Sequence, residues 1–123
     1  MILFIDSITN NQLTLALILG KKVVAQQTVL GGGVSEKFLP SLNLFLKNQK
    51  IKTTTIKKIV VAVGPGGFSH TRIAVAVANT LAFAWRVPVA AVSTGLDSTQ
   101  LINELSRLKL NKIVVPIYKY PAV

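Results

Sequence analysis

Residues 57–92, KKIVVAVGPGGFSHTRIAVAVANTLAFAWRVPVAAV, contain the pattern that decides the fold. Two short runs of aliphatic residues, 59–63 and 87–92, predict buried strands. Between them lie a turn rich in glycine and proline, residues 64–67, and an apolar helix, residues 69–85. A strand, a helix and a second strand of this length predict the right-handed crossover of a parallel sheet.

The turn at residues 64–67 must redirect the chain from strand to helix within four residues. Pro65 fixes its own φ, the three glycines permit conformations that a β-carbon forbids, and Ser69 stands where an N-cap belongs. One interpretation is a cradle for an anion, because a glycine loop before a helix presents free N–H groups. The other is a tight turn without a ligand. The spacing matches neither a Walker A loop nor a dinucleotide fingerprint.

The helix predicted at residues 69–85 is apolar around most of its circumference, so we expect two of its faces to be buried. The stripe that we expect to face one neighbour consists of Ile73, Val77 and Leu81. The small side chains that would let a second helix approach closely are Ala74, Ala78 and Ala82. That second neighbour is either another helix of this chain or a helix of a partner protein.

The composition indicates one small cytoplasmic domain. The 123 residues are half hydrophobic with a mean hydropathy of +0.54, yet the longest uncharged stretch, from residue 7 to residue 20, has only 14 residues. No membrane span or signal peptide is therefore expected. The absence of cysteine excludes disulfides, thiol catalysis and zinc–thiolate clusters.

The chain is strongly basic, with 14 lysines and arginines against four acidic residues and a net charge of +10. Such an excess favours contact with polyanions, and binding of this kind weakens with salt. Five lysines in one connection are the candidate RNA contacts: Lys47, Lys50, Lys52, Lys57 and Lys58. The alternatives are a charge that keeps an oily domain soluble, or an AT-rich genome that favours lysine.

The other elements complete a recognisable order. We expect a strand at 2–5, a hairpin of strands at 12–19 and 22–30, and a helix at 35–48 that contains Pro40 near its start. A third helix is expected at 98–108 and an edge strand at 111–117. The order βββαβαβα with a terminal strand predicts an α/β fold: a single ribonuclease H-like lobe of the actin and sugar-kinase superfamily, with a mixed sheet and helices on both faces.

Few residues are available for catalysis. His70 is the only histidine, and no carboxylate lies near it in the sequence, as a catalytic triad would require. Asp6 is either a phosphate or magnesium contact or a turn residue at a strand end. The four acidic residues are too scattered to predict a two-metal nuclease. We expect no catalytic residue, no metal site, no cofactor and no enzymatic activity.

Three segments resemble the bacterial TsaB (YeaZ) family. Residues 1–7, MILFIDS, resemble its opening strand, and residues 34–40, VSEKFLP, resemble the start of its first helix. Residues 64–74, GPGGFSHTRIA, are similar to its glycine-rich signature at seven of eleven positions, with departures that include His70 and Thr71. The resemblance extends over nearly the whole chain and covers only the N-terminal lobe of that family.

The resemblance implies a non-catalytic scaffold that pairs with a TsaD-type catalytic subunit, and with a TsaE-type ATPase, in threonylcarbamoyl modification of the transfer RNA adenosine beside the anticodon. It also implies one lobe over residues 1–123 with no second lobe, and pairing through a helix bundle. The residues expected to bind the partner are Leu42, Phe45, Ile73, Ala74, Val77, Ala78 and Leu81. Without a partner we expect a homodimer.

Two other functions remain open. One is a free-standing basic module that binds RNA, in which case transfer RNA contacts the lysines directly. The other is a peptidase or nuclease, whose turnover would depend on Asp6 or His70.

Overall fold

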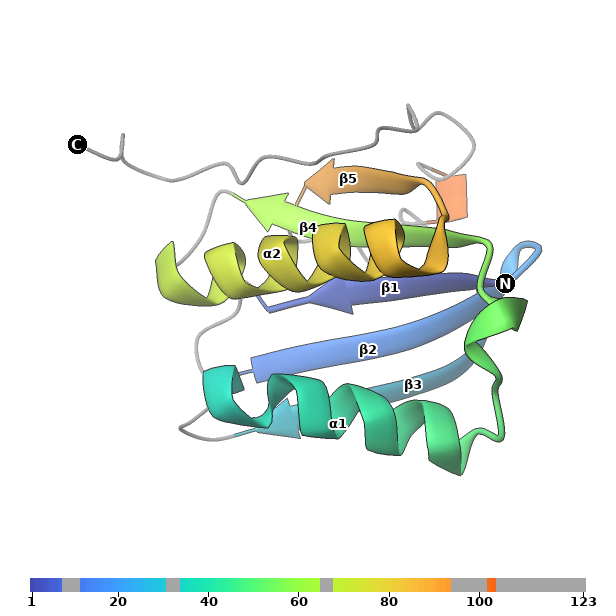
Figure 1. Cartoon of the computed structure of the whole chain (residues 1–123), viewed down its shortest axis with the longest axis horizontal. Coiled ribbons are helices and arrows are strands. Elements are labelled where there is room, and N and C mark those ends of the chain that lie inside the picture. Colours follow the sequence, from blue (N-terminus) through green and yellow to red (C-terminus); the bar gives the residue numbers. More distant parts are fainter. Residues whose placement is uncertain (8–11, 31–33, 65–67, 94–101, 104–123) are drawn as a thin grey trace.

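The computed structural model of the chain describes residues 1–7, 12–30, 34–64, 68–93 and 102–103 (Figure 1). Its elements follow the predicted order. They are β1 (Ile2–Asp6), β2 (Gln12–Leu19), β3 (Lys22–Leu30), α1 (Val34–Asn48), a 3₁₀ turn η1 (Thr53–Thr55), β4 (Lys58–Gly64), α2 (Phe68–Trp85) and β5 (Val89–Ser93). The expected third helix and terminal strand lie outside the described residues, apart from the helical pair 102–103.

The five strands form one mixed sheet in the order β3-β2-β1-β4-β5. β1 pairs antiparallel with β2, and β2 pairs antiparallel with β3. β4 lies parallel to β1 on one side and to β5 on the other. The mixed α/β sheet of a ribonuclease H-like lobe is therefore confirmed, as is the crossover from β4 through α2 to β5.

The β2–β3 hairpin has the predicted boundaries because its turn chemistry leaves little choice. Leu19 pairs with Lys22, so only Gly20 and Lys21 make the turn. Gly20 has a φ of 64°, the left-handed conformation that a two-residue hairpin turn needs and that glycine adopts without steric cost.

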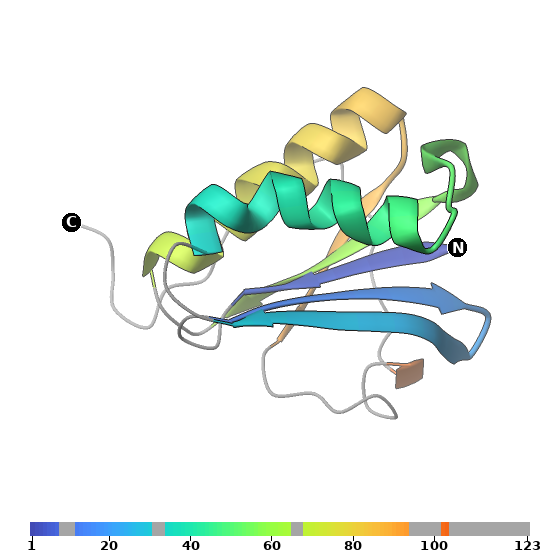
Figure 2. The same cartoon turned by 90° about the horizontal axis from the view of Figure 1, so that it is seen from below.

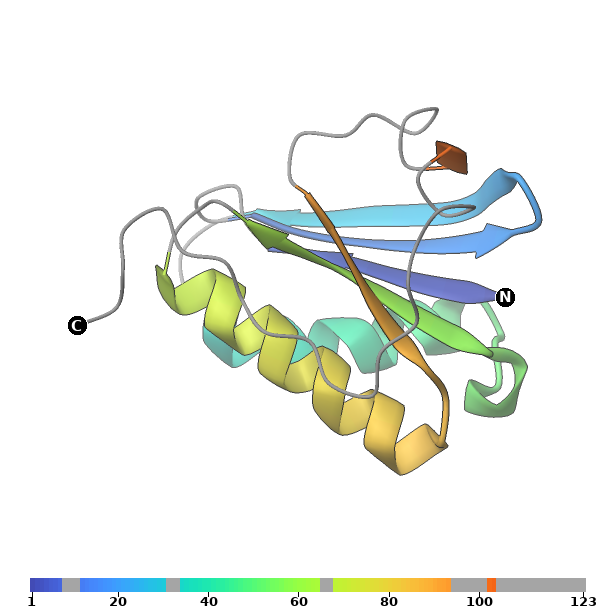
Figure 3. The ribbon, with the colours of Figure 1, turned by 90° about the horizontal axis from the view of Figure 1, so that it is seen from above.

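Both long helices lie on the same face of the sheet (Figures 2 and 3). Beneath them is the larger core, to which the strands contribute large aliphatic side chains such as Leu3, Ile5 and Ile59. The opposite face carries a smaller cluster that includes Phe4, Ile18 and Val60. The helical pair 102–103, which falls within the third helix predicted at 98–108, lies on that opposite side of the sheet (Figure 2).

Both helices end in the same way and at the same end of the molecule (Figure 1). In α1 the N–H of Ile51 donates to the carbonyl of Leu46 at 3.0 Å, and in α2 the N–H of Val87 donates to that of Ala82 at 3.0 Å. These bonds close Schellman-type caps. Because Val87 belongs to the cap and Pro88 has no N–H, β5 begins at residue 89, not at 87 as predicted.

Two predicted helix starts are corrected by one residue. α1 begins at residue 34 and α2 at residue 68, so Ser69 lies inside its helix and does not precede it as an N-cap residue does. Pro40 is exposed in the second turn of α1, and the helix continues through it. No helix within the described ranges has the combined length and apolar character needed to cross a bilayer.

Candidate protein-binding surface

Four of the seven residues predicted to bind a partner are buried inside the chain's own core. Leu42 and Phe45 on α1 are 1% exposed, and Ala74 and Ala78 on α2 are fully buried. They belong to the cluster between the helices and the sheet. The prediction that these four side chains form an outer surface is therefore wrong.

The physical reason lies in which stripe of α2 faces the sheet. The small residues face it: Ala74, Ala78 and Ala82 pack into the core beneath the helix, and α2 contacts chiefly β4. A helix approaches its neighbour more closely where the contacting side chains are small. The alanine ridge thus fits the helix to its own sheet, and a second helix is not needed to cover it.

The other three predicted residues lie at the margin of the core. Ile73, Val77 and Leu81 are half-buried and pack against the core cluster from one flank of α2. Their partial exposure leaves part of each side chain available to a partner. The flank that they form is apolar along three turns of the helix.

The side chains that do face solvent on these helices include three large apolar ones. Phe83 on α2 is 88% exposed, and Leu39 and Leu44 on α1 are 52% and 53% exposed. A phenylalanine held this far out of the core is unusual, because burying such a ring stabilises a protein by roughly 1.5–3 kcal/mol. We define Leu39, Leu44 and Phe83 as the outer apolar surface.

The exposed residues near Phe83 on α2 include small ones. Ala76, Thr80 and Ala84 are exposed, and the Thr80 hydroxyl donates to the carbonyl of Ala76 at 2.8 Å. That bond satisfies the hydroxyl within the helix, so this part of the surface presents mainly methyl groups. Sequence reasoning missed Phe83 because the whole helix is apolar. For Leu44 the sequence does carry a signal, because this residue falls outside the apolar stripe that Phe38, Leu42 and Phe45 form on α1.

The remaining candidate sites from the sequence are Asp6, the glycine turn and His70. Asp6 ends β1, is half-buried and lies opposite Thr14. The turn at residues 65–67 and the side chain of His70 are outside the described part of the chain. Among the side chains that are described, no three metal-ligating residues gather in one place.

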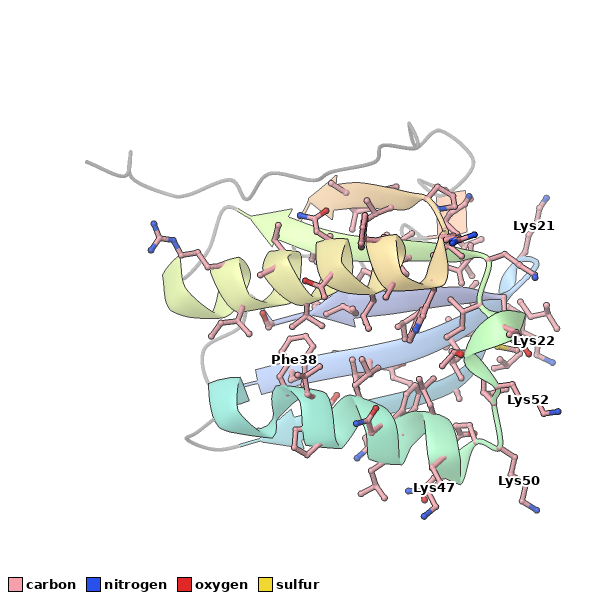
Figure 4. The ribbon with its side chains drawn as sticks, in the orientation of Figure 1. Lys21, Lys22, Phe38, Lys47, Lys50 and Lys52 are labelled. Atoms are coloured by element: carbon pink, nitrogen blue, oxygen red, sulfur yellow. The ribbon has the colours of Figure 1, made fainter. Side chains whose placement is uncertain are left out.

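The five predicted RNA contacts do come together. Lys47 and Lys50 at the end of α1 lie with Lys52 at one end of the molecule (Figure 4). Lys57 and Lys58 join them at the start of β4, where the N–H of Lys57 donates to the carbonyl of Met1 at 2.9 Å. Sequence reasoning missed the cations that join this group from elsewhere in the chain: Lys21, Lys22 and Arg86.

Two of the comparisons with known proteins, the family model and the curated relatives, point to the threonylcarbamoyl modification of transfer RNA adenosine. Residues 21–105 match the model of the family described as TsaD: tRNA N6-adenosine threonylcarbamoyltransferase. The tRNA threonylcarbamoyladenosine biosynthesis protein TsaB of Bacillus subtilis is 31% identical over 97% of this chain and 55% of its own length. TsaB of Buchnera aphidicola is 31% identical over 47% of this chain and 28% of its own length.

A solved structure, YeaZ from Pseudomonas aeruginosa, superimposes with a TM-score of 0.67 and 29% sequence identity. The match covers 75% of this chain and 43% of the YeaZ chain. This chain thus spans about half the length of the relatives that it matches. The curated relatives and the solved structure are TsaB and YeaZ proteins, and the chain belongs to the TsaB (YeaZ) family.

Proposed function

We propose that this chain is a non-catalytic scaffold that binds a TsaD-type catalytic subunit in the threonylcarbamoyl modification of transfer RNA. The relatives are named as biosynthesis proteins for threonylcarbamoyladenosine in transfer RNA, which supports a role in this pathway. The part of the chain that would bind the partner is the described lobe, in which α1 and α2 cover one face of the sheet.

The observation that carries the proposal is the exposure of Phe83. A ring that is 88% exposed on a regular helix contributes little to the stability of the chain itself. Phenylalanine is among the residues that are enriched in protein interfaces relative to the rest of the surface. We therefore place the docking surface on the outer apolar surface, with Phe83 as its main contact.

This location revises the predicted surface while keeping both helices. α1 and α2 lie side by side on one face of the sheet (Figure 1), so a partner that packs across them would form the helix bundle that the family resemblance implies. Leu39 and Leu44 come from α1 and Phe83 comes from α2. The buried alanine ridge and the pair Leu42 and Phe45 then support this surface from below.

The experiment is co-expression of the chain with the TsaD-type subunit from the same genome. We expect the two proteins to co-purify through a tag on either one. We also expect threonylcarbamoyladenosine to appear in unmodified transfer RNA only when both are supplied with the other components of the pathway. The proposal would be contradicted if the TsaD-type subunit did not co-purify with this chain and modified transfer RNA at full rate without it.

A further inference from the structure

The cations of the described structure gather at one end of the molecule. Both helices finish, and β1, β4 and β5 begin, at the end that carries Lys21, Lys22, Lys47, Lys50 and Lys52 (Figure 4). Lys57 and Lys58 belong to the same end because they stand at the start of β4, as does Arg86, which directly follows α2. Among the arginine and lysine side chains that the structure describes, only Arg72 lies elsewhere, in the first turns of α2. Asp6, the last residue of β1, lies at the opposite end of that strand. We call this group of eight the basic end.

A pocket of 470 Å³ opens within the basic end, in the range of about 300–1,000 Å³ that ligand pockets occupy. Its lining combines two cations, Lys57 and Arg86, with two hydroxyl-bearing residues, Thr53 and Thr54. The indole of Trp85 and the ring of Pro88 supply apolar surface beside them. Cations, hydroxyls and one aromatic ring are the groups that bind the phosphate, the sugar and the base of a nucleotide.

Hydrogen bonds fix the backbone of the pocket wall. The N–H of Ile56 donates to the carbonyl of Thr53 at 3.1 Å and closes η1. The N–H of Ile59 donates to the carbonyl of Pro88 at 3.0 Å and joins β4 to the segment that follows α2. A site held in this way loses little conformational freedom when a ligand binds.

The helix caps provide a second, independent observation. Arg86 and Lys50 occupy the left-handed positions of the two Schellman-type caps, with φ of 56° and 55°. Glycine is the common residue at this position because a β-carbon is strained there. Two cations stand instead, both at the basic end and one of them in the pocket lining. Glycine would suit the backbone better at both positions.

We propose that the basic end binds RNA, with its lysines along the phosphate backbone and one unstacked nucleotide in the pocket beside Trp85. An anionic membrane is a poorer fit, because a membrane-binding end presents protruding aromatic rings, whereas Trp85 lies in a concave pocket. The charge and the pocket are observed in this chain, so the proposal that the basic end binds RNA does not depend on the scaffold function. Only the choice of transfer RNA as the probe rests on the proposed function.

The test is a titration of the purified chain with unmodified transfer RNA at several salt concentrations. Trp85 is the only tryptophan, so its fluorescence reports on the pocket directly. We expect binding that weakens with salt and a saturable quench of Trp85. In Arg86→Gly we expect affinity to fall about fivefold to tenfold, the quench to be lost, and the salt slope to fall by about 0.7.

Arg86→Gly also separates binding from folding, because glycine suits the left-handed position and the thermal stability should be unchanged or higher. Arg72→Gln removes a cation from outside the basic end and should leave RNA affinity unchanged. Equal losses in the two variants would overturn the inference, as would binding without a Trp85 response. The inference would also be overturned if the chain bound vesicles of anionic phospholipid, lost that binding in Arg86→Gly, and showed no binding to RNA.

Failure of this inference and failure of the proposed function give different results. Arg86→Gly should co-purify with the TsaD-type subunit, because Leu39, Leu44 and Phe83 are unchanged in this variant. RNA binding at the basic end without any partner binding would contradict only the scaffold function. Partner binding with no RNA affinity at any salt concentration would contradict only the inference about the basic end.

Discussion

Ala74 and Ala78 determine how closely α2 lies on the sheet. Both are fully buried against the core, where neighbouring side chains are packed without room for extra methylene groups. A substitution there changes the stability of the chain before it changes any partner contact. Glutamate at either position would bury a charge, so it would report on folding and could not serve as a test of docking.

The first prediction follows from this burial. Ala78→Leu should lower the free energy of unfolding by about 1–3 kcal/mol, because the larger side chain forces α2 away from β4. Urea denaturation followed by circular dichroism measures the change. Ala76→Leu, on the exposed side of the same helix, should stay within about 0.5 kcal/mol of the parent. Equal values for the two variants would show that the alanine ridge does not face the sheet.

At the scale of elements, the sequence predicts the strands and helices well because their periodicities are local. The hairpin strands have their predicted limits since Gly20 and Lys21 define the turn. What the sequence does not decide is the rotation of α2 about its axis. An alternating run of alanine and valine offers several apolar stripes of similar strength, and only the sheet selects one of them.

The pocket in the basic end was not predictable for a different reason. Its lining comes from η1 and from the end of α2, which lie about 30 residues apart and meet only through the parallel pairing of β4 with β5. Charge counting found Lys57 and missed Arg86. Arg86 follows α2, so it can be assigned to the basic end only when the ends of α1 and α2 are known to lie at the same end of the molecule.

The hairpin carries the second prediction. Gly20→Val should lower the free energy of unfolding by about 1–2 kcal/mol, because a branched side chain is strained at a φ of 64°. No atom lies within 4 Å of the added Cβ, so backbone strain is the only cost. Thermal denaturation measures it. Lys21→Ala, at the neighbouring turn position, should be neutral, and a neutral Gly20→Val would contradict the turn conformation.

The whole molecule divides into two working surfaces. The outer apolar surface lies on the helices, and the basic end lies where those helices finish. They differ in chemistry, so salt should weaken contacts at the basic end much more than contacts at the outer apolar surface. The two surfaces adjoin at the end of α2, where the N–H of Arg86 donates to the carbonyl of Phe83 at 3.3 Å, so the response to salt is the property that tells them apart.

Self-association of the isolated chain is the third prediction. With no partner present, the outer apolar surface should pair with a second copy, so sedimentation velocity should show a dimer that dissociates on dilution. Phe83→Glu should shift the chain to a monomer, because a carboxylate in the dimer contact would lose its hydration. A dimer of undiminished strength in Phe83→Glu would place self-association on a different surface.

The most direct measurement of the central claim is the affinity of the chain for the TsaD-type subunit by isothermal titration calorimetry. The matched pair is Phe83→Glu on α2 and Val24→Glu on β3, since both replace an exposed apolar side chain with glutamate. We predict a loss of at least about tenfold for Phe83→Glu and a change of less than about threefold for Val24→Glu. Unchanged affinity in Phe83→Glu, or equal losses in both variants, would contradict the claim that α1 and α2 form the docking surface.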